Sequence, residues 1–161
     1  MQKKIICNTE EDTIVLAEQF AQIAKKKDVF ALYGTLGMGK SVFARAFIQK
    51  LCDVEDVPSP TFTLVQTYSS SKGEIYHYDL YRLKNPDEVF ELGFEESLYS
   101  GINLIEWPEN AGNWLPKDVI KIQIVPHETG RLFIIDVFSS EKENRLETIK
   151  WAKTFMQPVS T

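Results

Sequence analysis

The sequence predicts a single α/β domain over residues 1–161, with a mixed sheet that is largely parallel at its centre, carries antiparallel hairpin strands and is flanked by helices. Continuous apolar runs at 29–33 (VFALY) and 102–106 (INLIE) are typical of buried parallel strands. Alternating segments around the turns SSKG and PHETG are typical of antiparallel hairpins. The length suits one domain with a buried core and is short for two.

The first two helices follow from capping residues and apolar spacing. Thr9, with Asp12 three residues later, forms a capping-box pattern after the short strand KKIICN. Leu16 and Phe20 then continue one apolar row at the helical period. A second amphipathic segment, VFARAFIQKL (42–51), predicts a helix directly behind the glycine-rich stretch that follows the first buried strand.

The rest of the chain predicts shorter helical pieces. Residues 86–99 are typical of short helical turns. Ser140 and Glu143 have the spacing of another capping box and predict a final helix over about 141–156. We interpret this last helix as a packing appendage of the domain.

The composition is that of an ordinary globular protein, with 43% hydrophobic and 25% charged residues. A net charge of -5 gives no broad attraction to RNA, DNA or anionic lipid, so a partner protein would have to hold any nucleic acid. Acidic residues interrupt the N-terminal MQKKIICNTEED before any signal-peptide core, and no apolar stretch could span a bilayer. We therefore expect a cytoplasmic protein with two reduced cysteines, Cys7 and Cys52, and no membrane partner.

The stretch GTLGMGKS, residues 34–41, matches GxxxxGK[ST], the P-loop. In such a loop, backbone N–H groups surround a phosphate at a helix N-terminus. Lys40 is expected to place its charge on the β- and γ-phosphates, and the Ser41 hydroxyl to bind Mg²⁺. The pattern predicts a P-loop NTPase-like fold with ATP and Mg²⁺ as cofactors. The expected nucleotide-binding residues are Gly34, Thr35, Leu36, Gly37, Met38, Gly39, Lys40 and Ser41.

Two acids are candidates for the magnesium side of this site. Glu106 ends the buried run INLI, so its carboxylate should emerge at the same sheet edge as the P-loop. Asp79 shares one strand face with Ile75 and His77. We expect function for both acids, with Glu106 and Ser41 as the metal-binding residues; a structural hydrogen bond is the simplest role for His77.

The segment SPTF, residues 59–62, supplies a third kind of candidate. Pro60 restricts the backbone of Ser59 and fixes its own φ angle, so Thr61 is presented in a defined place. A hydroxyl held in this way can sense a γ-phosphate or its magnesium ion, as switch loops do. The predicted catalytic set is therefore Lys40, Thr61, Asp79 and Glu106.

Taken together, GTLGMGKS, SPTFTLVQTY, YHYDLYRL, LGFEE and LIEWPEN resemble, in this order and spacing, the TsaE family of small bacterial P-loop ATPases, over roughly residues 9–138. The resemblance implies an accessory protein that supports the threonylcarbamoyladenosine modification of tRNA without transferring the group itself. It implies a weak ATPase that docks on a complex of TsaB and TsaD and meets tRNA only through these partners.

The same resemblance assigns roles to single residues. Lys40 and Ser41 would bind phosphate and Mg²⁺, Thr61 would belong to a switch-like loop, and Glu106 would be a magnesium-side acid. Asp79 would join them in hydrolysis or assembly. Trp107 occupies a position that the family places near the nucleotide and the partner surface, while a buried core tryptophan fits the sequence equally well. Thr35 and Met38 depart modestly from the residues usual in the family's loop.

Two other functions fit a P-loop in a chain of this size. A small-metabolite kinase usually carries clustered arginines that stabilise the transferred phosphoryl group. The four arginines here are scattered, at Arg45, Arg82, Arg131 and Arg145, which argues against a kinase. A nucleotide-gated binding module, in which hydrolysis is incidental, stays open. A GTPase is disfavoured because no NKxD-like guanine-reading segment is present.

Overall fold

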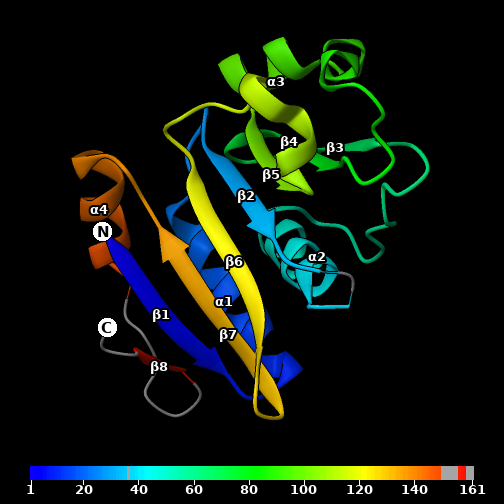
Figure 1. The fold of residues 1–161 in the computed structure, drawn as a ribbon. Helices are drawn as coiled ribbons and strands as arrows, with labels where there is room; N and C mark the ends of the chain where they lie inside the picture. The colour runs from blue at the N-terminus through cyan, green and yellow to red at the C-terminus, as the bar shows by residue number, and fades with distance from the viewer. Residues whose placement is uncertain (36, 150–155, 159–161) are drawn as a thin grey trace.

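The computed structural model describes residues 1–35, 37–149 and 156–158, and these form one eight-stranded sheet with helices on both faces (Figure 1). The strands are β1 (Gln2–Cys7), β2 (Val29–Tyr33), β3 (Val65–Ser70), β4 (Gly73–Asp79), β5 (Ile102–Glu106), β6 (Ile120–His127), β7 (Gly130–Asp136) and β8 (Met156–Pro158). The α-helices are α1 (Glu10–Ile23), α2 (Lys40–Leu51), α3 (Phe94–Ser100) and α4 (Ser140–Glu147), and two 3-10 helices, η1 (Pro86–Leu92) and η2 (Pro108–Trp114), complete the described elements.

The strand order is β3-β4-β5-β2-β6-β7-β1-β8, and the central strands β4, β5, β2 and β6 run parallel. The hairpins β3–β4 and β6–β7 are antiparallel, as are the pairs that β1 makes with β7 and β8. The predicted fold class is therefore confirmed. The parallel centre brings the carboxyl ends of β2, β4 and β5 to one edge of the sheet, where β4 ends in Asp79, β5 ends in Glu106 and β2 leads into the P-loop.

The position of β2 between two cores explains why its sequence is a continuous apolar run. Phe30 and Leu32 face the core that α1 and α2 cover, whereas Val29 and Ala31 face a second core under η1, α3 and η2. Both faces of the strand are thus sealed from water. In the first core the ring of Phe30 packs edge-on against Phe20 of α1 and Phe47 of α2, with centroid separations of 6.1 and 4.9 Å.

The start of α1 matches its prediction. The Thr9 side chain accepts a hydrogen bond from the Asp12 backbone N–H, while the Asp12 carboxylate accepts from the backbone of Thr9. This reciprocal pair satisfies two N–H groups that an α-helix leaves free at its N-terminus. The capping box therefore fixes where α1 begins.

The end of the chain differs from its prediction. The helix expected over about 141–156 ends at Glu147, and its N-cap is Ser139, whose side chain accepts from the Lys142 N–H. Residues 150–155 lie outside the described residues, and Met156–Pro158 form β8 beside β1. An unpaired edge of β1 offers backbone hydrogen bonds that a helical pattern in the sequence does not reveal. Within the described ranges, no helix is long and apolar enough to cross a membrane.

Candidate nucleotide-binding site

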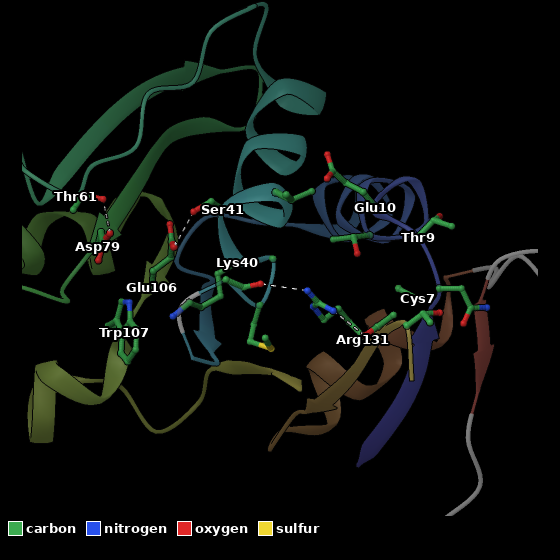
Figure 2. A pocket seen from close by; sticks show the side chains of 18 residues that line it. Cys7, Thr9, Glu10, Lys40, Ser41, Thr61, Asp79, Glu106, Trp107 and Arg131 are labelled. Carbon is green, nitrogen blue, oxygen red and sulfur yellow. Dashed lines mark hydrogen bonds between the residues drawn. The ribbon is translucent and has the colours of Figure 1, made fainter. Parts of the chain in front are cut away.

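A cavity of about 450 Å³ opens at the carboxyl edge of the parallel strands (Figure 2). It is lined by residues 37–42, from the P-loop and the first turn of α2, and on one side by Thr61, Asp79, Glu106 and Trp107. The other side is lined by residues 7–10 with Thr13, and by residues 129–131. All four residues predicted as catalytic therefore line one cavity.

Lys40 is the first residue of α2, and its buried side chain lies within the site. Its Nζ donates a hydrogen bond of 2.6 Å to the Gly34 carbonyl and lies 3.6 Å from the centroid of the Trp107 ring. Burial lowers the pKa of Lys40, while the negative charges of Glu106, Glu109 and Asp79 act in the opposite direction. The ammonium group is therefore poorly solvated. A phosphate oxygen would be a stronger hydrogen-bond acceptor for it than the Gly34 carbonyl.

Two glycines shape the loop before Lys40. Gly39 caps α2 in the left-handed region (φ 93°) and contributes no side-chain cap, so the first N–H groups of the helix face the cavity unobstructed. A Cβ at Gly34 would lie 2.9 Å from the Ile124 carbonyl oxygen of β6. Loop and neighbouring strand therefore pack at a distance that only glycine allows.

The remaining loop residues differ in their placement. Met38 lines the cavity and also packs against the core that α1 and α2 cover. Thr35 is exposed and does not line the cavity, although its carbonyl accepts from the Met38 N–H. Leu36 lies outside the described residues.

Glu106 is a buried carboxylate that two side chains contact. Its Oε2 lies 2.7 Å from Nε2 of His77, which is also buried, and its Oε1 accepts a hydrogen bond of 3.5 Å from the Ser41 hydroxyl. The structural hydrogen bond expected for His77 is therefore present. Among the residues that the structure describes, Nδ1 of His77 has no hydrogen-bond partner, so the described polar contact of the ring is with Glu106. This bond holds one carboxylate oxygen and leaves the other facing Ser41.

Asp79 lies beside Glu106 because the two residues are register partners across β4 and β5. Its Oδ2 accepts a hydrogen bond of 3.2 Å from the Thr61 hydroxyl, and its Oδ1 accepts from the backbone N–H of Tyr81. The Thr61 hydroxyl also lies 2.7 Å from that of Ser59. The predicted hydroxyl of the SPTF segment thus meets the second predicted acid inside the cavity.

Trp107 lines the cavity next to Lys40 and also packs, half-buried, against the core under η1, α3 and η2. Its ring contacts the ring of Tyr81, with centroids 4.9 Å apart. Its backbone adopts a left-handed conformation (φ 58°), which is costly for a bulky residue and is found most often at functional sites.

Ser41 and Glu106 supply the oxygen ligands that Mg²⁺ prefers, and their side chains already point toward each other. In the described part of the chain, no group of three or more His, Cys, Asp or Glu side chains gathers into a metal site of its own. This donor set fits a cation that takes its other ligands from phosphate oxygens and water.

The contact between His77 and Glu106 predicts that His77 positions the carboxylate of Glu106, and this can be tested. We expect His77→Leu to weaken Mn²⁺ binding to the nucleotide complex, because Oε2 of Glu106 loses its only described donor. His77→Gln, whose amide can donate to the same oxygen, should restore part of the affinity. Electron paramagnetic resonance of Mn²⁺ measures this directly, and equal affinities for the two variants would contradict the role.

The second wall of the cavity was missed by sequence reasoning. Arg131 is the register partner of Cys7 in the β1–β7 pair, and its guanidinium donates a hydrogen bond of 3.3 Å to the Gly37 carbonyl of the P-loop. Thr9 and Glu10, at the start of α1, lie on the same side. Burial raises the pKa of Cys7 to about 12, with the nearby charge of Asp12 adding to the effect, so this thiol stays neutral and unreactive. No short motif marks this wall, because its parts meet only through strand pairing.

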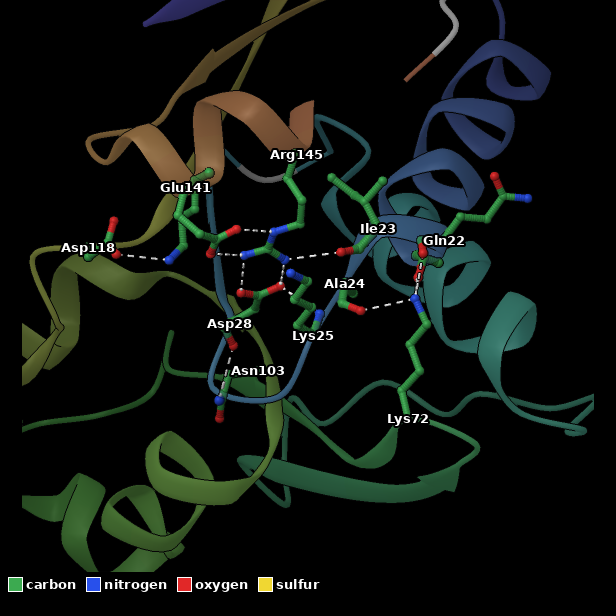
Figure 3. Close-up of polar contacts among 12 residues, drawn as sticks. Gln22, Ile23, Ala24, Lys25, Asp28, Lys72, Asn103, Asp118, Glu141 and Arg145 are labelled. Atoms are coloured by element: carbon green, nitrogen blue, oxygen red, sulfur yellow. Dashed lines mark hydrogen bonds and ion pairs between the residues drawn. The ribbon is translucent and has the colours of Figure 1, made fainter. Parts of the chain in front are cut away.

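A second hollow lies at the other end of β2 (Figure 3). Two of the basic residues that line it, Lys72 and Arg145, already bind partners within the protein. Lys72 donates to three carbonyls at the C-terminal end of α1, those of Ala21, Gln22 and Ala24. Arg145 binds Asp28, Glu141 and the Ile23 carbonyl. These contacts satisfy a helix terminus and a buried acid. The first cavity is therefore the better candidate for a phosphate ligand.

Comparisons with known proteins show what the whole chain is similar to. The profile of the family "Threonylcarbamoyl adenosine biosynthesis protein TsaE" matches residues 7–133. A Rickettsia felis protein named tRNA threonylcarbamoyladenosine biosynthesis protein TsaE is 46% identical over 139 residues, which cover 85% of this chain and 81% of that protein. A Bacillus subtilis protein of the same name is 36% identical over 115 residues, 71% and 72% of the two chains. The crystal structure of Bacillus subtilis YdiB superposes with a TM-score of 0.74 at 28% identity, covering 92% of this chain and 94% of that chain.

Proposed function

This chain belongs to the TsaE family, which acts in the biosynthesis of threonylcarbamoyladenosine in tRNA, and we propose that its part in this pathway is to bind ATP with Mg²⁺ and to hydrolyse it slowly. The observation that supports this proposal best is the convergence of Lys40, Ser41 and Glu106 in one cavity. A cation, a hydroxyl and a carboxylate at the N-terminus of α2 are the groups that a magnesium triphosphate requires.

Each group in the cavity has a distinct task in this proposal. Lys40 gives up its bond to the Gly34 carbonyl and neutralises charge on the β- and γ-phosphates. Ser41 and Glu106 would hold Mg²⁺, which supplies further charge neutralisation when bound. Asp79 and Thr61, joined by a hydrogen bond, lie on the same side of the cavity. In this proposal they would orient the attacking water. Arg131 and the start of α1 would contact the nucleoside or its α-phosphate.

The proposed partners are TsaB and TsaD. The chain alone hydrolyses ATP weakly, and the complex of these two proteins raises the rate. Contact with tRNA is indirect, through the partners, which fits a net charge of -5. The first test is a pull-down with purified TsaB and TsaD, with and without ATP and Mg²⁺. Absence of association in every nucleotide state would rule out this part of the proposal.

We expect Lys40→Ala to weaken ATP binding by about 10- to 100-fold, since a hydrogen bond to a charged group contributes about 1.5–3 kcal/mol. Titration with a fluorescent ATP analogue measures the affinity. Lys50→Ala is the matched control, because Lys50 is an exposed residue in the last turn of the same helix. Unchanged affinity in Lys40→Ala would mean that ATP binds elsewhere.

Assays on the same purified proteins distinguish this proposal from a small-metabolite kinase and from a nucleotide-gated binding module. Arg131 lines the cavity whereas Arg45, Arg82 and Arg145 do not, so an arginine cluster of the kind expected for a kinase is not assembled there. Transfer of radiolabel from ATP to a metabolite would nonetheless favour a kinase. Full tRNA modification by a variant that binds ATP but cannot hydrolyse it would favour a nucleotide-gated module.

A further inference from the structure

Asn110, the last residue of the LIEWPEN stretch, lies in η2 and is not among the residues that line the nucleotide cavity. Its half-buried side chain reaches the segment that follows β4, where Nδ2 donates a hydrogen bond of 2.8 Å to the Leu80 carbonyl. Its backbone N–H donates to the Trp107 carbonyl at 3.1 Å. Leu80 follows Asp79 and Trp107 follows Glu106 in the sequence, so Asn110 contacts the residue directly after each predicted acid.

Strand β4 is followed by a tight turn from Leu80 to Leu83, here called the β4 turn. The Leu83 N–H closes it by donating to the Leu80 carbonyl at 3.1 Å. Within the turn, the Tyr81 N–H donates to Oδ1 of Asp79 at 3.0 Å, while the Thr61 hydroxyl donates to the other carboxylate oxygen. The position of the Asp79 carboxylate therefore depends on where this turn lies.

Strand β5 is followed by a second turn, from Trp107 to Asn110, here called the η2 turn. Trp107 adopts its left-handed backbone (φ 58°) in this turn, and such strain persists only where the surrounding structure holds it. The hydrogen bond from the Asn110 N–H to the Trp107 carbonyl is one contact that does so. The η2 turn in this way places the centroid of the Trp107 ring 3.6 Å from Nζ of Lys40.

The amide of Asn110 joins the two turns. Within the described ranges, it makes the only side-chain hydrogen bond between them. The backbone adds one bond at their base, from the Leu80 N–H to the Glu106 carbonyl at 3.0 Å. The rings of Tyr81 and Trp107 also touch, but a ring contact is less directional than a hydrogen bond. The amide therefore sets the spacing between the two segments that follow the acids.

We propose that Asn110 is a positioning residue for ATP hydrolysis, whose amide holds the β4 turn and the η2 turn at the spacing at which Asp79 and Glu106 act together. This inference rests on the proposed function and adds a residue that acts through others. In the part of the chain that the structure describes, no hydrogen bond joins Asn110 to the P-loop. Loss of the amide should therefore change the rate of hydrolysis far more than the affinity for ATP.

The test compares Asn110→Leu, which removes the amide at similar size, with Asn110→Gln, which keeps an amide donor. With TsaB, TsaD and Mg²⁺, we expect Asn110→Leu to lower kcat by about tenfold, because a small misplacement of catalytic groups is costly. Its affinity for a fluorescent ATP analogue should stay within about twofold of the unmodified chain. Asn110→Gln should recover part of kcat. Asn113→Leu is the matched control, because Asn113 is an exposed residue of the same short helix.

A spectroscopic measurement tests the η2 turn without hydrolysis. The chain is labelled with fluorotryptophan, and the fluorine NMR resonance of Trp107 is assigned by its disappearance in Trp107→Phe. We expect this resonance to shift in Asn110→Leu and to stay in place in Asn113→Leu, because the ring lies against Lys40 only while the turn is held. Thermal unfolding confirms that each variant is folded. Asn110→Asp, whose carboxylate cannot donate, replaces Asn110→Leu if the latter does not fold.

The outcomes distinguish this inference from the proposed function. Either an unchanged kcat or an unmoved Trp107 resonance in Asn110→Leu overturns the inference and leaves the proposed function standing. Equal losses of rate in Asn110→Leu and Asn113→Leu, or no recovery in Asn110→Gln, would also overturn it. If the unmodified chain hydrolyses no ATP, the proposed function fails and the role in hydrolysis fails with it. The Trp107 resonance then still decides whether Asn110 holds the turn.

Discussion

Glu106→Gln should lower the rate of ATP hydrolysis on the order of 100-fold, the size of effect seen when one group that stabilises developing charge is removed. The substitution keeps the shape of the side chain and a possible contact with His77, but it removes the negative charge that faces Ser41. The rate is measured as phosphate release in the presence of TsaB, TsaD and saturating Mg²⁺.

The control for this prediction is Glu109→Gln. Glu109 is an exposed acid on η2 that does not line the cavity, although its charge reaches Lys40. We expect the rate of this variant to stay within about twofold of the unmodified chain, as for most surface substitutions. Equal rates for Glu106→Gln and the unmodified chain would exclude Glu106 from the hydrolytic site.

Arg145→Leu should lower the free energy of unfolding by about 3–5 kcal/mol, the usual cost of leaving one partner of a buried ion pair alone. The guanidinium of Arg145 contacts both carboxylate oxygens of Asp28, and the two side chains are only 10% and 4% exposed. The hydrogen bond to Asp28 is the main cause that raises the pKa of Arg145, so the guanidinium stays charged at neutral pH. Urea denaturation measures the loss.

Arg45→Leu serves as the matched control, because Arg45 is an exposed residue of α2 and its loss should cost less than about 0.5 kcal/mol. Replacing Asp28 by Asn in the Arg145→Leu variant removes the stranded charge and should recover part of the stability. A loss in Arg145→Leu no larger than that in Arg45→Leu would show that the pair does not hold α4 to the sheet.

Much of the fold was predictable because it depends on short stretches of sequence. The capping box at Thr9 and the apolar run of β2 can each be recognised within a few consecutive residues. The proximity of Asp79 to Glu106 could also be predicted, since the carboxyl ends of parallel strands lie at a common edge of the sheet. The helix over 141–156 was wrong in extent, because a competing strand edge lies more than a hundred residues away in the chain.

The P-loop, the class of the sheet and the two acids could be predicted from the amino-acid sequence, since each follows from local spacing and from the direction of neighbouring strands. Three features became visible in the folded chain alone: Arg131 and the start of α1 close the cavity, His77 contacts Glu106, and the exposed ring of Phe62 lies beneath Arg82. Each of these contacts joins residues from separate elements. Their distances depend on strand order and register, which no short motif encodes.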